Sequence, residues 1–113
     1  MGKIYISIPA TPPSVNVYVR HARGGHYKTP EAKAFATHVA LCAGKHRNAN
    51  IEAECVEITI TLGKGQRMDI DNCAKVILDS LVRCGVIRSD ATIRHLVIGK
   101  CRGENPQTEI WIS

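Results

Sequence analysis

A run in the middle of the chain, Val-Glu-Ile-Thr-Ile-Thr-Leu at residues 56–62, constrains the fold more than any other feature. Apolar and polar residues alternate along it with a period of two, which predicts a β-strand with one buried face. A basic turn with two glycines follows at residues 63–67, and apolar residues then recur at helical spacing from about Asp71. Gly85 is a natural stop for this helix, because glycine adopts the left-handed cap conformation without a side-chain penalty. The centre of the chain is therefore predicted to be a strand, a short turn and a helix.

The flanking segments predict the remaining elements. Period-two patterns indicate strands at residues 3–9, 93–101 and 108–112. A helix is predicted at residues 29–45, with Thr29 as its N-cap. The apolar face of this helix is expected to contain Ala32, Phe35, Ala36, Val39, Leu41 and Cys42. The order strand, helix, strand, helix, strand, strand predicts an α+β fold in which a mixed sheet of about four strands packs with two helices.

Length and composition limit the classes of protein to which the chain can belong. Its 113 residues are enough for one small domain, residues 1–113, and a net charge of +5 favours a polyanionic partner. Five cysteines without a C-x-x-C pair argue against a zinc ribbon or a disulfide framework, and predict reduced thiols packed in a cytoplasmic protein. No signal pattern and no apolar run of about 18 residues occurs, so no membrane span is predicted. The motif G-x-x-x-x-G-K-[ST] is absent, which argues against a nucleotide cofactor.

Basic residues are concentrated in two segments. Residues 20–28 join three fixed positive charges and two histidines to a Gly-Gly pair. This composition is typical of a mobile arm that settles on phosphates, or of an ordinary surface loop, and the segment alone does not decide between the two. The basic turn before the central helix supplies further cations. The predicted phosphate contacts are Arg20, Arg23, Lys28, Lys64 and Arg67.

Acidic residues with regular spacing lie at the start of the central helix. Asp69 and Asp71 are one residue apart, and at 100° per residue Asp71, Lys75 and Asp79 fall within an arc of about 80°. Paired carboxylates suit Mg²⁺, with Mn²⁺ as a substitute, because Mg²⁺ prefers hard oxygen ligands. Lys75 would then face negative charge that develops on a phosphoryl group. Spacing alone leaves open a second interpretation, in which Asp71 is an N-cap and the stripe is a ladder of weak ion pairs.

Two ordered blocks of residues carry a resemblance to a known family. The blocks are Pro12-Pro13-Ser14-x-Asn16-x-Tyr18 with Arg20-His21, and Asp69-x-Asp71-Asn72-x-x-Lys75-x-x-x-Asp79-x-Leu81 followed by Gly85 and Asp90. With these blocks the chain resembles the RusA family of Holliday junction resolvases over nearly its whole length. The resemblance implies a RusA-like α+β fold and a homodimeric, Mg²⁺-dependent endonuclease that nicks four-way DNA junctions.

The resemblance also implies roles for single residues. Asp69, Asp71 and Asp90 match the family's metal ligands, and Lys75 matches its essential lysine. Asn16 joins the predicted DNA contacts, while Asn72 and Asp79 are expected to orient the site. The chain departs from the family in a less basic segment before Asp69 and in Val86, where an aromatic residue can occur.

The predicted function is the resolution of branched DNA by a two-fold enzyme. A four-way junction is cut by two symmetry-related nicks, which a homodimer with one carboxylate site per subunit matches. Metal-activated water would leave 5′-phosphate and 3′-hydroxyl ends. The alternatives are a module that binds branched DNA without cutting it, and a metal-dependent nuclease for flaps or plain duplex.

Overall fold

The fold is taken from a computed structural model. It describes residues 4–13, 19–22, 25–28, 30–66, 68 and 70–113, and for residues 19–22, 25–28, 71 and 72 it describes the backbone alone. Asn16, Arg23, Arg67 and Asp69 therefore lie outside the described residues, as does the predicted N-cap Thr29.

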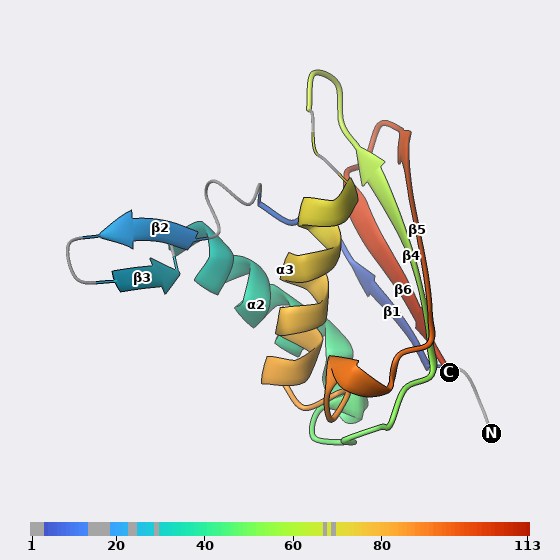
Figure 1. The fold of residues 1–113 in the computed structure, drawn as a ribbon. Coiled ribbons are helices and arrows are strands. Elements are labelled where there is room, and N and C mark those ends of the chain that lie inside the picture. Colours follow the sequence, from blue (N-terminus) through green and yellow to red (C-terminus); the bar gives the residue numbers. More distant parts are fainter. Residues whose placement is uncertain (1–3, 14–18, 23–24, 29, 67, 69) are drawn as a thin grey trace.

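A four-stranded mixed sheet and two helices form the domain (Figure 1). The strands β1 (Ile4–Ile8), β4 (Cys55–Leu62), β5 (His95–Arg102) and β6 (Gln107–Ile112) are arranged in the order β1-β6-β4-β5. β6 pairs antiparallel with β1 and β4, whereas β5 pairs parallel with β4. The predicted α+β fold and the order of these elements are confirmed.

The helices α2 (Pro30–Ala43) and α3 (Ile70–Arg83) lie on one face of the sheet (Figure 1). Alternate residues of β4, from Val56 to Leu62, are buried under them, as the period-two pattern predicts. α2 ends two residues earlier than predicted, because Gly44 takes a φ of +53° and opens a 3₁₀ turn, Gly44–His46. Gly85, with a φ of +77°, lies just beyond α3, as predicted.

One predicted core position on α2 is wrong. Leu41 is 70% exposed, whereas Ala32, Phe35 and Val39 are buried. At 100° per residue, Leu41 lies about 200° from Val39 and therefore points away from the sheet. The helical period is correct, but the buried face of α2 is narrower than predicted.

The basic segment at residues 20–28 contains two strands that the sequence interpretation did not predict. Its backbone forms a hairpin of β2 (Val19–Ala22) and β3 (Gly25–Lys28), which makes a two-stranded sheet of its own. The strands pair antiparallel, with Val19 opposite Lys28 and Ala22 opposite Gly25. Two residues separate the strands in the sequence, a connection length that is common in hairpins and that the sequence interpretation did not consider. The hairpin projects from the rest of the molecule beside α2 (Figure 1).

The five cysteines are all free, as predicted. Cys73 is buried in the core, but Cys101 is exposed on β5, so the thiols are not uniformly packed inside. Within the described part of the chain, neither helix is long and apolar enough to cross a membrane.

Candidate active site

The loop that leads from β4 to α3 is fastened by its own hydrogen bonds. The Gly63 backbone N–H donates to the Gln66 side-chain oxygen at 2.7 Å, and the Gln66 backbone N–H donates back to the Gly63 carbonyl at 3.1 Å. The Gln66 amide nitrogen donates to the Thr11 hydroxyl at 3.4 Å, which joins this loop to the segment after β1. Lys64 is exposed on this loop, as a phosphate contact must be. The backbone that approaches Asp69 is thus held in place.

Two basic side chains on β5 also donate hydrogen bonds to this segment, and neither was predicted from the sequence. The Lys100 ammonium donates to the carbonyl of Met68, the residue before Asp69, and the Arg102 guanidinium donates to the Gly63 carbonyl at 3.1 Å. Lys100 and Arg102 share a strand face with Leu96 and Ile98, because side chains alternate along a strand. The change from apolar to basic residues along that face was the signal that could have identified them.

The first turn of α3 contains the backbone of Asp71 and Asn72. Carboxylates near this end are favoured by the positive pole of the helix dipole. Lys75 follows one turn later and is exposed, and Asp79 follows after another turn and is half-buried. Arg20 and Lys28 belong to the hairpin strands β2 and β3.

Asp90 lies at the other end of α3. It opens a 3₁₀ turn, Asp90–Thr92, in which the Ala91 N–H donates to the Ser89 hydroxyl at 3.1 Å. The Thr92 hydroxyl donates to the Ala53 carbonyl at 2.7 Å and ties this turn to the rest of the fold. The Asp90 side chain is exposed and accepts no hydrogen bond from another described residue.

A hollow of about 410 Å³ brings Asp90 together with Asp79 rather than with the start of α3. Its lining residues are Asp79, Val82, Arg83, Arg88, Ser89 and Asp90. Asp71 precedes Asp79 by eight residues, about 12 Å along the helix axis. The Asp90 turn and the first turn of α3 accordingly lie at opposite ends of the helix (Figure 1). Within one chain the backbone of Asp71 and the Asp90 turn are therefore apart, and the described side chains form no cluster of three potential metal ligands.

Comparison with known proteins identifies relatives of this chain. The family model for endodeoxyribonuclease RusA matches residues 9–113. The crossover junction endodeoxyribonuclease of Enterobacteria phage 82 is 31% identical over 100 residues, which cover 82% of this chain and 78% of that protein. The crossover junction endodeoxyribonuclease of Escherichia coli strain K12 has the same identity and coverage. This chain belongs to the RusA family. It is therefore a nuclease, and the resemblance inferred from its two residue blocks is confirmed.

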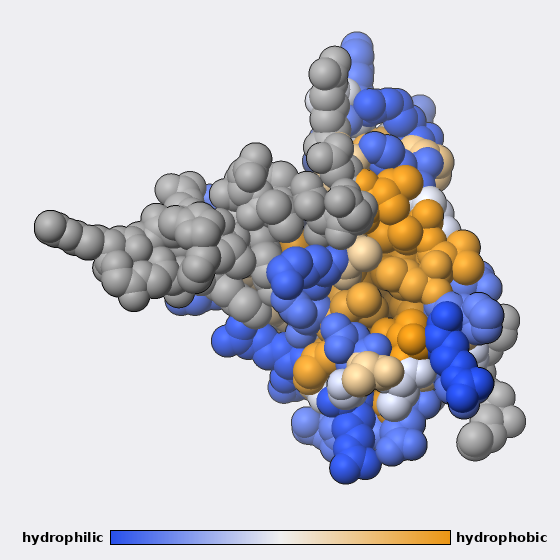
Figure 2. Space-filling view, viewed as in Figure 1, coloured by the Kyte–Doolittle hydropathy of each residue, from blue (hydrophilic) through white to orange (hydrophobic). Residues whose placement is uncertain are grey.

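The RusA-family chain also has an apolar surface that none of its described residues covers. Ile70 and Val82 on α3 are 37% and 38% exposed, and Leu96 on β5 is 41% exposed. Leu78 lies between Ile70 and Val82 at helical spacing and is partly buried. Figure 2 shows a hydrophobic area over this region, between α3 and the β5 edge of the sheet. We call it the α3–β5 surface, and it connects the two ends of α3.

Proposed function

We propose that this chain is an Mg²⁺-dependent endodeoxyribonuclease that resolves four-way DNA junctions by paired symmetric nicks. The observation that carries the proposal is its relationship to crossover junction endodeoxyribonucleases, combined with acids at positions 69, 71 and 90 and a lysine at 75. The products would carry 5′-phosphate and 3′-hydroxyl ends. The five free thiols agree with a reducing compartment, so we assign the protein to the cytoplasm.

Hard oxygen ligands are available for the ion. Asp69, Asp71 and Asp90 would hold Mg²⁺, which suits carboxylates and keeps several of its waters. When bound, the ion lowers the pKa of a water molecule and polarises the phosphoryl group, and Mn²⁺ could replace it. Lys75, exposed one turn into α3, would stabilise the negative charge that develops on the phosphate. The Lys100 ammonium donates a hydrogen bond to the carbonyl of Met68, the residue that precedes Asp69 in the sequence.

A homodimer would complete each site. Two copies of α3 that pack across the α3–β5 surface, about a two-fold axis perpendicular to the helix, run antiparallel. The start of one α3 then approaches the end of the other. Asp69 and Asp71 of one copy would meet Asp90 of the second copy, which removes the separation found within one chain. The exposed Ile70, Val82 and Leu96 support a second copy as the occupant of this surface.

Cleavage of a synthetic four-way junction tests the activity. We expect the purified protein to cut it with Mg²⁺ and not with EDTA, and we expect Asp71→Asn to abolish the cut. Flap and plain duplex substrates are run beside it. Binding of the junction without cleavage in Mg²⁺ or Mn²⁺ would identify a binding module, and faster cleavage of flaps or duplex would identify a different nuclease.

Mixing two inactive variants tests the shared site. Asp71→Asn and Asp90→Asn are each expected to be inactive as homodimers. In a mixed dimer, one site receives both substituted residues, but the other receives native Asp71 and native Asp90. Nicking should therefore reappear after the variants exchange subunits. If each site were built within one chain, every site in the mixture would lack a ligand, and no nicking would return.

A further inference from the structure

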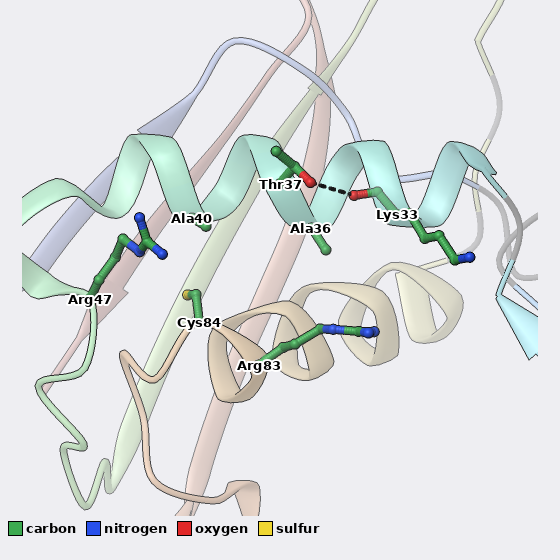
Figure 3. A pocket seen from close by; sticks show the side chains of 7 residues that line it. All are labelled: Lys33, Ala36, Thr37, Ala40, Arg47, Arg83 and Cys84. Carbon is green, nitrogen blue, oxygen red and sulfur yellow. Dashed lines mark hydrogen bonds between the residues drawn. The ribbon is translucent and has the colours of Figure 1, made fainter.

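A groove between α2 and α3 has cations along its length. Its volume is about 250 Å³, and its lining residues are Lys33, Ala36, Thr37, Ala40, Arg47, Arg83 and Cys84. Figure 3 shows Lys33 and Arg47 toward opposite ends of the groove, with Arg83 on the α3 side. All three cations are exposed. We call this feature the α2–α3 groove, and none of the residues predicted to bind DNA lines it.

Helix stability and ion pairing do not account for the three positive charges of the groove. Arg83 lies in the last turn of α3, where a cation is favourable, but Lys33 lies in the first turn of α2, where the helix dipole opposes it. No acidic residue of the described chain lines the groove. The salt bridge among the described residues joins Arg88 to Glu52 and involves none of the three groove cations. Their charge is therefore available to an anionic ligand.

The spacing of the cations favours a chain of phosphates over a single ion. The groove follows α2 from Lys33 to Ala40, a rise of about 10 Å. Phosphates of one DNA strand recur about every 3.4 Å along the duplex axis and lie farther apart along the winding strand, so this length accommodates more than one phosphate. Ala36 and Ala40 have short side chains, which let a backbone approach between the charged residues.

The groove is continuous with the Asp90 end of the proposed site. Arg83 lines both the α2–α3 groove and the hollow that contains Asp79 and Asp90. A strand whose phosphate reaches Asp90 would pass Arg83 and enter the groove. We propose that the α2–α3 groove binds the phosphodiester backbone of DNA that flanks the cleaved bond, with Lys33, Arg47 and Arg83 as its phosphate contacts. The position relative to the cut rests on the proposed function, whereas the binding of a DNA backbone does not.

Salt dependence of binding tests the groove. Lys33→Gln, Arg47→Gln and the double variant are compared with Lys45→Gln, which removes the same charge from an exposed position outside the groove. Kd for a four-way junction and for plain duplex is measured without divalent metal over a series of salt concentrations. Each groove variant should reduce the slope of log affinity against log salt by about one, and the double variant by about two. Lys45→Gln should retain the wild-type slope.

The outcomes separate this proposal from the proposed function. Groove variants with the same slopes as Lys45→Gln on both DNAs would overturn the groove, even if the wild type resolves junctions. Reduced slopes in a protein that cuts no DNA would support the groove and refute the enzymatic proposal. The substituted side chains are exposed, so thermal unfolding should match the wild type and exclude loss of the fold.

Discussion

Replacement of Lys100 by methionine is the sharpest test of how the site is held. Lys100 reaches from β5 to the Met68 carbonyl, one residue before Asp69. Methionine keeps much of the apolar stem and removes the ammonium, so the change deletes a single contact. We expect the backbone that carries Asp69 to lose its anchor while the sheet remains intact.

The expected effect on stability is small, and the expected effect on metal binding is large. A hydrogen bond that involves a charged group contributes about 1.5–3 kcal/mol, and exposure to solvent brings this one down to about 1 kcal/mol. A domain of this size would then unfold about 4 °C lower. Loss of a residue that supports a metal ligand typically costs 10-fold to 100-fold in metal affinity or activity. The Mg²⁺ concentration for half-maximal cleavage should therefore rise at least about tenfold.

A Mg²⁺ titration of junction cleavage, with thermal unfolding in parallel, measures both effects. Lys100→Arg keeps a donor on a long stem and should recover most of the wild-type Mg²⁺ dependence. Lys45→Met removes an equal charge from the turn after α2 and serves as the control. An unchanged half-maximal Mg²⁺ concentration in Lys100→Met would refute the anchoring role, and so would an equal shift in Lys45→Met.

Three further predictions concern the fold that supports this site. Gly85 and Gly65 both have positive φ, but a Cβ at Gly85 would lie 3.0 Å from neighbouring backbone, whereas a Cβ at Gly65 would meet nothing within 4 Å. In urea unfolding, Gly65→Ala should therefore lower the free energy of unfolding by about 1–2 kcal/mol, and Gly85→Ala should lower it clearly more. Equal losses in the two variants would contradict the close approach at Gly85. Ile60 is fully buried in β4, so Ile60→Ala should cost about 2–5 kcal/mol in the same assay, and a loss well below this would place Ile60 outside the core. The hydrogen bond from Tyr5 to the Glu109 carboxylate raises the pKa of Tyr5, so this group stabilises the fold below the ordinary tyrosine pKa and loses its contribution as pH rises through the raised value. Tyr5→Phe should remove that alkaline loss of stability in unfolding curves at several pH values, and identical pH dependence in both proteins would count against it.

Local periodicity made most of the fold predictable from the sequence. In β4 and β6 every second residue is buried, because each strand has one face under the helices and one face open. The helices were equally visible, because their apolar spacing and, for α3, the terminal Gly85 are local signals. The hairpin β2–β3 was missed because the composition of its segment drew attention to charge, and its two-residue connection was not considered.

The arrangement of the site depended on contacts that no local pattern contains. Lys100 and Arg102 act on residues more than thirty positions away, so their role requires the pairing of β5 with β4. The separation of Asp90 from Asp71 likewise follows from where the chain returns after α3. A sequence motif gives the order of its residues but not the end of a helix near which each residue lies in the folded chain. The sequence therefore supplies candidate residues for the site but not the way in which they assemble.

Different faces of α3 carry buried, apolar exposed, polar and basic side chains. Counted at 100° per residue from Ile70, the buried residues extend from Val76 at about 240° through 0° to Leu81 at about 20°. Val82 on the apolar α3–β5 surface lies at about 120°, and Arg83 on the basic groove lies at about 220°. The arc between Val82 and Arg83 carries the polar stripe that includes Lys75 and Asp79. Lys75, which is proposed for the chemistry, thus stands between a surface suited to a second copy and a groove suited to DNA, so one short helix can join subunit, substrate and active site.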